Sequence, residues 1–283
     1  WFSGYRTKKE AQKDLTRILY ELEKDALVIP STDTLKEYLE YWIGQREPNL
    51  SPTTIYGYKA IINNHIVPEL GNIKWNELKP LHIQEYYKKK LETLSNLTVL
   101  HHHRLLRKAL QASMQWQPIK NNPADYVESP KTKRYKAKVL DVDEIKKLLE
   151  ALEGDRLEVP ITLMLFLGLR RGELLALKWS DIDYENKTIT IQRNLVRAGE
   201  DGTELIIKDP KTEESIRTIP ISDNVLALLK KQELKQKENK LKLGPYYKDS
   251  DFVFTTEEGE LINPASFSRM FGDFLKKHNL KKI

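Results

Sequence analysis

The chain is long enough for two ordinary domains, and its composition excludes several classes of protein. Its 283 residues are 40% hydrophobic and include no cysteine, which excludes disulfide scaffolds, cysteine-based zinc sites and thiol catalysis. No run of eighteen apolar residues occurs, so we expect a cytoplasmic protein without a membrane span, and the net charge of +6 favours an anionic partner, nucleic acid first.

Helical patterns fill the first part of the chain. A charged amphipathic helix is expected from about residue 7 to residue 27, and a block of four or five helices begins at Thr34. Ser51 followed by Pro52 marks one helix start, because a hydroxyl can cap the turn that proline opens. A later helix, from about residue 97 to residue 115, should point Val99, Leu106, Leu110 and Ser113 inward. We therefore predict the end of one domain at residues 1–30 and an all-α domain at 31–128.

A basic segment at residues 129–138 joins this domain to the next. From Lys131 to Lys138 it carries five basic residues and no acidic one. A solvated linker and a contact with a DNA backbone explain that charge equally well.

The pattern changes in residues 139–283. Asp141 and Glu144 form a capping box ahead of an amphipathic helix, and the apolar run 160–167 predicts a helix buried on all sides. The further elements expected are a short helix at 170–177, strands at 188–192, 205–207, 216–221 and 252–254, a turn at 200–202, and helices at 224–240 and 264–277. The sequence thus predicts an α+β domain with a small antiparallel sheet beside a helical core.

Two local patterns in this half suggest chemistry with a phosphate. Arg170 and Glu173 stand three residues apart at a helix start, where a guanidinium fixed by a carboxylate can grip an anion in two places. The same spacing also fits a purely structural ion pair. Lys211 precedes a strand, where an ammonium at a loop tip can reach a DNA groove and transfer a proton, although taken alone an ordinary surface lysine explains it better.

Taken together, these patterns resemble a known family. The run Gly-Leu-Arg-Arg-Gly-Glu-Leu-Leu-Ala-Leu at 168–177, followed by Lys-Trp-Ser-Asp-Ile-Asp at 178–183 and by Lys211, resembles the catalytic domain of tyrosine recombinases. Residues 50–54 and 121–124 resemble the core-binding domain of that family, which is all-α and SAM-like. Residues 1–17 resemble the end of an arm-binding domain found in integrases of Gram-positive conjugative transposons and phages. The resemblance covers essentially the whole chain.

The resemblance implies a role for each matching residue. Arg170 would grip the non-bridging oxygens of the scissile phosphate, Glu173 would support the helix of that arginine, and Lys211 would protonate the departing 5′ hydroxyl. Arg171 lies about 100° round the helix and should point away, toward a structural role or a DNA backbone contact. The expected DNA-binding residues are Thr53, Arg104, Lys108, Lys131, Lys133, Arg134 and Arg171.

The rest of the family's catalytic set has no counterpart at the expected place. A His-x-x-Arg pair, a further His or Trp and the nucleophilic tyrosine should follow the helix at 264–277, and none of the thirteen tyrosines lies there. His101 to Arg104 spells His-x-x-Arg inside the helical domain, and we interpret it as a decoy. We expect His102 or His103 to pack near Leu106, with the other side chains facing DNA or solvent, and no metal site, because adjacent residues on a helix diverge. We expect a fragment truncated at its C-terminus, with a gene product that ends here as the alternative.

The function implied is that of a site-specific DNA recombinase without metal or nucleotide cofactor. It would cut and rejoin DNA through a 3′-phosphotyrosyl intermediate, to integrate or excise a mobile element in a bacterial cytoplasm. The implied partners are duplex attachment sites, three further copies of the chain in a tetramer on DNA, and an excisionase-type accessory factor. Two alternatives stay open at this point: a catalytically inert DNA-binding remnant or regulator, and a type IB topoisomerase.

Overall fold

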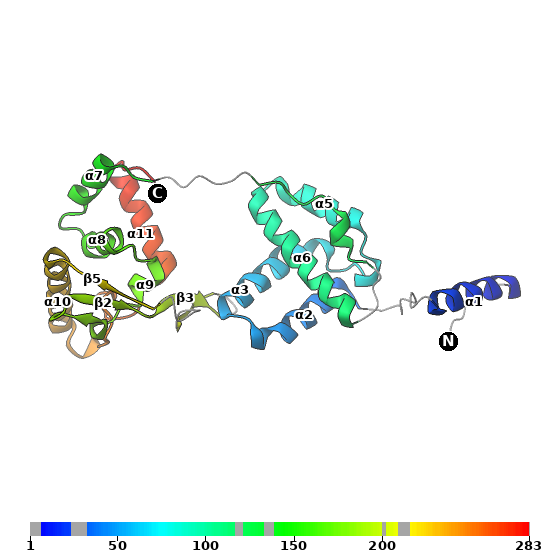
Figure 1. Cartoon of the computed structure of the whole chain (residues 1–283), viewed down its shortest axis with the longest axis horizontal. Helices are drawn as coiled ribbons and strands as arrows, with labels where there is room; N and C mark the ends of the chain where they lie inside the picture. The colour runs from blue at the N-terminus through cyan, green and yellow to red at the C-terminus, as the bar shows by residue number, and fades with distance from the viewer. Residues whose placement is uncertain are drawn as a thin grey trace. The chain divides into compact units, whose positions relative to one another are not determined.

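The computed structural model divides into two compact units, Trp1–Tyr135 and Lys136–Ile283 (Figure 1). It describes residues 7–23, 33–116, 121–132, 139–199, 202–208 and 216–282. Within these ranges no helix combines the length and the apolar character that a membrane span requires. The finer division predicted at residues 30, 128 and 138 stays a prediction.

The first unit is helical, as predicted. Helix α1 spans Lys8–Glu23, within the helix expected there, and residues 24–27 of that expectation lie outside the described ranges. The helices that follow are α2 (Leu35–Arg46), α3 (Pro52–Ile61), α4 (Val67–Leu70), α5 (Pro80–Leu91) and α6 (Asn96–Trp116), with a π-helical turn at Ile62–Ile66 between α3 and α4. The Ser51 side chain caps α3 through the backbone N–H of Thr54, which confirms that predicted start.

The core of this unit forms where one face of α6 meets α2 and α5. The four inward residues predicted for α6 are buried, which confirms that stripe. Tyr38 of α2 donates its hydroxyl hydrogen bond to the backbone carbonyl of Ala109 at 2.6 Å and stacks on Trp75 at 5.4 Å between ring centroids. Burial of a tyrosine is tolerated here because its hydroxyl finds an acceptor.

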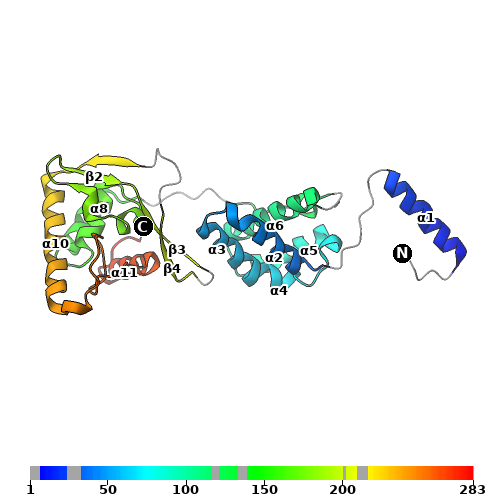
Figure 2. The same ribbon diagram turned by 90° about the horizontal axis from the view of Figure 1, so that it is seen from below.

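In its described residues the second unit combines α-helices with small antiparallel sheets, which confirms the predicted α+β class (Figure 2). Its helices are α7 (Val142–Leu152), α8 (Glu158–Leu167), α9 (Arg171–Leu175), α10 (Asp223–Leu243) and α11 (Pro264–Lys277). Strands β1 (Ile182–Asp183), β2 (Thr188–Ile191) and β5 (Arg217–Pro220) form one sheet in the order β1-β2-β5, and β3 (Asn194–Ala198) pairs with β4 (Glu204–Lys208).

Several sequence-based expectations for this unit need correction. Strand β3 was not predicted, because its pairing with β4, rather than its own composition, defines it. The strand expected at 252–254 is wrong, since Phe252 makes only an isolated bridge with Lys178. Helix α8 is not buried on all sides: Leu165 and Phe166 in its last turn are 37% and 65% exposed, because that turn reaches the surface just before the chain reverses.

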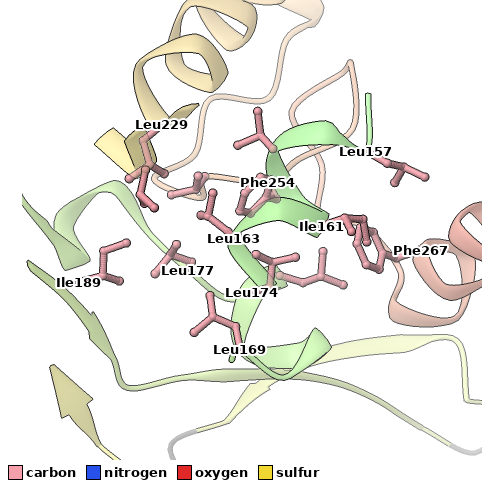
Figure 3. Packing of buried hydrophobic residues seen from close by; sticks show 14 of the residues in the cluster. Leu157, Ile161, Leu163, Leu169, Leu174, Leu177, Ile189, Leu229, Phe254 and Phe267 are labelled. Carbon is pink, nitrogen blue, oxygen red and sulfur yellow. The ribbon is translucent and has the colours of Figure 1, made fainter. Parts of the chain in front are cut away.

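Helices α8 and α9 lie at the centre of the core of this unit (Figure 3). Leu163 and Leu174 are fully buried there, and α10, α11 and β2 surround them with apolar side chains. Since α9 begins at the edge of this core, its first turn is held rigidly while the residue before it reaches the surface. The residues labelled in Figure 3 are Leu157, Ile161, Leu163, Leu169, Leu174, Leu177, Ile189, Leu229, Phe254 and Phe267.

Candidate active site and nucleic-acid interface

The turn between α8 and α9 sets the position of Arg170. Gly168 ends α8 with φ of +62°, a left-handed conformation that glycine adopts without steric cost. The chain then buries Leu169 and places Arg170 as the extended cap residue before α9. The cap position turns the Arg170 side chain to the surface, and it is 77% exposed.

Glu173 anchors this turn from inside. Its Oε2 accepts a hydrogen bond from the backbone N–H of Arg170 at 2.9 Å, and its Oε1 accepts one from Arg170 Nη1 at 2.8 Å. The Glu173 side chain is only 9% exposed. The structure therefore brings the predicted pair together, with the carboxylate buried and the guanidinium held at the surface, a suitable geometry for binding an anion.

Arg217, at the start of β5, is a third member of this cluster that the sequence analysis missed. It donates from Nη1 to Glu173 Oε1 at 3.2 Å and from Nη2 to Glu173 Oε2 at 2.7 Å. One signal could have found it: Arg217 is the only charged residue in the alternating run 216–221.

The electrostatics of the cluster keep Glu173 ionised. Burial raises the pKa of Glu173, but hydrogen bonds from Arg217 and Arg170 outweigh it and lower the pKa to about 2. The same hydrogen bond with Glu173 raises the pKa of Arg217 above its ordinary value. Two guanidinium groups and one carboxylate leave the cluster with a net positive charge, which suits a phosphate.

Gly172 allows α9 to lie directly against β3. A Cβ added to it would clash with Asn194 Oδ1 and would lie 2.7 Å from the backbone oxygen of Leu195. Any side chain at this position would have to push the strand or the helix turn away. Gly172 thus fixes the distance between the Arg170 turn and the hairpin β3–β4.

Arg171 points to a different neighbour, as its place on the helix suggested. Its Nη1 donates to Ser268 Oγ of α11 at 2.6 Å, and the side chain is exposed. Its role in DNA binding stays a prediction. Lys211, the third expected catalytic residue, lies outside the described residues.

A second basic site lies on the helical unit. A hollow of about 630 Å³ is lined by four cationic side chains from two helices, Arg46 of α2 and Arg104, Arg107 and Lys108 of α6. Arg104 and Lys108 were predicted to bind DNA, whereas Arg46 and Arg107 were missed. Arg107 lies one turn after Arg104, which was the available signal.

The other expected DNA-binding residues are more scattered. Thr53 is half-buried in the first turn of α3, where its hydroxyl lies 3.1 Å from Ser51 Oγ. The Lys131 side chain is almost fully exposed, and its Nζ lies 3.3 Å from Glu128 Oε1. Lys133 and Arg134 lie outside the described residues. Binding of DNA by each of these residues stays a prediction.

Two histidines inside the His-x-x-Arg decoy, at its second and third positions, turn toward tyrosines of α5. His102 is fully buried, with Nδ1 2.8 Å from the hydroxyl of Tyr86, and His103 lies 2.9 Å from the hydroxyl of Tyr87. The prediction that one of these two histidines packs inward is confirmed, and so is the exposure of His101. Groups of three metal-ligating side chains are not found in the part of the chain that the structure describes.

Comparison with known proteins identifies the family of both units. Residues 34–91 match the N-terminal SAM-like domain of phage integrases, and residues 138–283 match the phage integrase family. The chain belongs to the phage integrase family of tyrosine recombinases. The Arg170 turn belongs to the run 168–177, which resembles the catalytic domain of this family.

Individual relatives agree with this assignment. The chain is 30% identical to a XerC-like tyrosine recombinase of Caldanaerobacter subterraneus, covering 96% of this chain and 74% of the relative. It is 26% identical to the ICEBs1 integrase of Bacillus subtilis, covering 98% of this chain and 75% of the relative. Its fold is similar to that of the Tn1549 transposon integrase solved in complex with transposon right end DNA, with a TM-score of 0.72 and 25% identity over 87% of this chain and 78% of that chain.

Proposed function

We propose that this recombinase cuts and rejoins duplex DNA at attachment sites of a mobile element, through a covalent 3′-phosphotyrosyl intermediate. The observation that carries the proposal is the pairing of an exposed Arg170 guanidinium with a buried, ionised Glu173. A regulator that only bound DNA would have no use for an arginine held in this way by a buried carboxylate.

In the proposed reaction, Arg170 binds the two non-bridging oxygens of the scissile phosphate. A tyrosine hydroxyl releases its proton to solvent and attacks phosphorus, the bond from phosphorus to the 5′ oxygen breaks, and Lys211 gives that oxygen a proton. Negative charge on the phosphoryl oxygens grows in the transition state, so a fixed guanidinium stabilises it more than the ground state. The reverse reaction with a new 5′ hydroxyl restores the phosphodiester, and the conserved bond energy makes a nucleotide cofactor unnecessary.

The helical unit would supply most of the grip on the DNA backbone. Arg46, Arg104 and Lys108 line a hollow whose positive charge suits a phosphate of the DNA backbone, and the basic residues from 131 to 138 would extend the contact. As in the family, we propose four protomers on two duplexes in the bacterial cytoplasm, with an excisionase-type factor assisting excision.

The nucleophile is proposed to lie outside these 283 residues. The second unit contains Tyr184, Tyr246 and Tyr247, and none of them follows α11, where the family resemblance places the nucleophile. We therefore expect these 283 residues alone to bind DNA without forming a covalent link.

Cleavage of a nicked duplex, in which the broken strand diffuses away and traps the covalent complex, tests the proposal. In the polypeptide that carries the nucleophilic tyrosine, Arg170→Ala should abolish trapping and leave duplex affinity nearly unchanged. Arg156→Ala is the matched control, since it removes an exposed guanidinium of the same unit from the turn before α8. Equal loss of binding and trapping in Arg170→Ala would contradict the catalytic assignment. Trapping that survives in Arg170→Ala would show that cleavage does not need this arginine, whereas a wild type that never traps DNA would be a DNA-binding protein only.

The DNA contacts are tested by salt dependence. Arg104→Ala, Lys133→Ala and Arg134→Ala should each weaken binding to all sequences alike and reduce the log–log salt slope by about one unit per lost phosphate contact. Lys36→Ala on α2, which removes a lysine paired with Glu40 outside the hollow, is the control. An unchanged slope in a variant means that its residue does not contact phosphate.

A further inference from the structure

We propose that Arg217 is a positioning residue of the catalytic site, which acts on the scissile phosphate through Glu173 and Arg170. The inference rests on the proposed function, since it assigns Arg217 a part in the same phosphate site. Arg217 stands 44 residues from Glu173 in sequence, on a different element, and reaches it across the edge of the core.

The hydrogen bonds of Glu173 show how Arg217 would act. Each carboxylate oxygen accepts one bond from Arg170 and one from Arg217: Oε1 from the two Nη1 atoms, and Oε2 from the Arg170 backbone N–H and from Arg217 Nη2. A carboxylate held at both oxygens by a planar guanidinium cannot rotate without breaking both bonds. Arg217 therefore fixes the plane of the group that fixes Arg170.

Arg170 and Arg217 differ in exposure, and this difference indicates a different role for each. The Arg217 side chain is 33% exposed and directs two of its nitrogens at Glu173, whereas the Arg170 side chain is 77% exposed and directs one. Arg170 thus keeps donors directed at solvent, where a phosphate would sit. Arg217 holds the carboxylate from the side of the sheet.

The charge balance gives Arg217 a second effect. Arg170 and Glu173 alone form a neutral pair, which attracts a phosphate weakly. With Arg217 the cluster carries one net positive charge, so Glu173 can orient Arg170 without cancelling its attraction for an anion. Loss of Arg217 should therefore weaken transition-state binding even where the Arg170 turn keeps its shape.

Arg217 also connects the catalytic turn to the strand after Lys211. It pairs with Ile191 at the end of the β2–β5 ladder and follows Lys211 by six residues in the sequence. The contact with Glu173 therefore fixes the start of β5, the strand that follows the proposed proton donor in the sequence.

The experiment compares Arg217→Gln with a matched variant, Arg193→Gln. Arg193 also binds a buried carboxylate of this unit, Asp181, with both oxygens 2.8 Å from its Nη1, whereas the hydrogen bonds of Glu173 come from Arg170 and Arg217. In the polypeptide with the nucleophilic tyrosine, at saturating DNA, Arg217→Gln should slow strand cleavage about 10- to 100-fold, as loss of an outer supporting contact typically does, with affinity for duplex DNA unchanged. Arg193→Gln should lower the melting temperature and leave the cleavage rate of the folded protein unchanged.

A pH profile separates positioning from a loss of structure. In the wild type the cleavage rate should show no decline from Glu173 down to pH 5, because its carboxyl stays ionised. In Arg217→Gln that decline should appear near pH 4 to 5, as the pKa of Glu173 returns toward its ordinary value. Arg217→Lys keeps the charge without the planar two-point contact and should recover part of the rate; it also serves as the test variant if Arg217→Gln does not fold.

Each outcome is decisive. Equal slowing in Arg217→Gln and Arg193→Gln overturns the positioning role. A wild-type rate and pH profile in Arg217→Gln, or in Arg217→Lys where Arg217→Gln does not fold, also overturns it. If Arg170→Ala abolishes cleavage while Arg217→Gln does not slow it, only this inference fails. If Arg170→Ala cleaves normally, the catalytic role of Arg170 fails as well, and if the wild type forms no covalent complex with DNA, the proposed function fails.

Discussion

The catalytic unit contains two carboxylate clusters with the same local design and different outcomes. Glu173 accepts the backbone N–H of Arg170, and Asp181 accepts that of Lys178, each three residues earlier and at 2.9 Å. Each carboxylate is buried, and each also binds an arginine from a later segment.

The difference lies in the residue at the cap. The Lys178 ammonium lies over the ring of Phe252, 5.2 Å from its centroid, whereas the Arg170 guanidinium returns to its own carboxylate and stays exposed. Asp181 Oδ1 instead accepts hydrogen bonds from two neighbouring side chains, Gln192 Nε2 at 2.6 Å and Arg193 Nη1 at 2.8 Å. The same capping pattern can therefore serve stability alone or hold a cation at the surface. The outcome depends on whether the side chain of the capping residue packs on the protein, as that of Lys178 does, or stays exposed, as that of Arg170 does.

The largest effect expected from this comparison is on stability. Asp181→Ala should lower the free energy of unfolding by about 3 to 5 kcal/mol, because it leaves the Arg193 guanidinium, whose side chain is only 23% exposed, without its carboxylate. Chemical denaturation measures the loss. Strand cleavage per folded molecule should be unchanged, and a selective loss of cleavage would show that the Asp181 cluster also serves the active site.

Glu173→Gln should affect mainly strand cleavage, in contrast to the loss of stability expected for Asp181→Ala. The amide keeps the shape of the side chain but loses the charge that orients Arg170 and binds Arg217, so cleavage should fall about 10- to 100-fold while duplex affinity changes little. Single-turnover cleavage at saturating DNA provides the measurement, and Asp181→Asn is the matched control. If the two amides slow cleavage alike, the two clusters do not differ in function.

The lowered pKa of Glu173 should make the stability of the catalytic unit depend on pH in acid. Since the pKa falls from 4.5 in the unfolded chain to about 2 in the folded one, the carboxylate stabilises the fold above pH 4.5, and this contribution disappears as the pH drops through that interval. Glu173→Gln should remove this part of the acid dependence, as followed by thermal melting between pH 5 and pH 2. An unchanged dependence would mean that Glu173 is not the titrating group.

The helical unit provides an internal reference for that titration. Burial lowers the pKa of His102 from 6.5 to about 4, so the unfolded chain binds the proton more readily and the helical unit should lose stability from pH 6.5 down to about pH 4. We expect NMR signals of the helical unit to broaden at higher pH than those of the catalytic unit. His102→Gln should shift only the first transition.

Lys178→Ala should have the smallest effect. Its contact with Phe252 contributes about 0.5 to 1 kcal/mol, as cation–π pairs at exposed sites do, and no part of it faces a phosphate in the proposed mechanism. Cleavage should stay at the wild-type rate, in contrast to Arg170→Ala at the equivalent cap. A comparable loss of cleavage would show that the two caps are functionally alike.

Local sequence patterns predicted the parts of the fold that depend on neighbouring residues. The capping box of Asp141 and Glu144, the buried face of α6 and the contact of Arg170 with Glu173 all involve residues within a few turns of one another. Such contacts follow from helical geometry, so periodicity and spacing identify them.

Contacts between distant segments were not predictable in this way. Arg217 meets Glu173 only because β5 returns beside α9, and Arg46 joins the α6 cations only because α2 packs beside that helix. Strand β3 was missed because pairing with β4, rather than its own composition, defines it. The exposure of Phe166 likewise depends on which neighbours cover the last turn of α8.

Gly172 has a consequence for how this protein can vary. Because the Arg170 turn contacts β3 at a glycine, the hairpin acts as a spacer for the phosphate-binding arginine, and the two segments must change together. A methyl group at residue 172 would be accommodated only with a smaller side chain at Asn194 and a shifted backbone at Leu195. Remodelling of the hairpin, which is remote from the chemistry in sequence, would therefore change the alignment of Arg170 with its phosphate before it changed any residue of the active site.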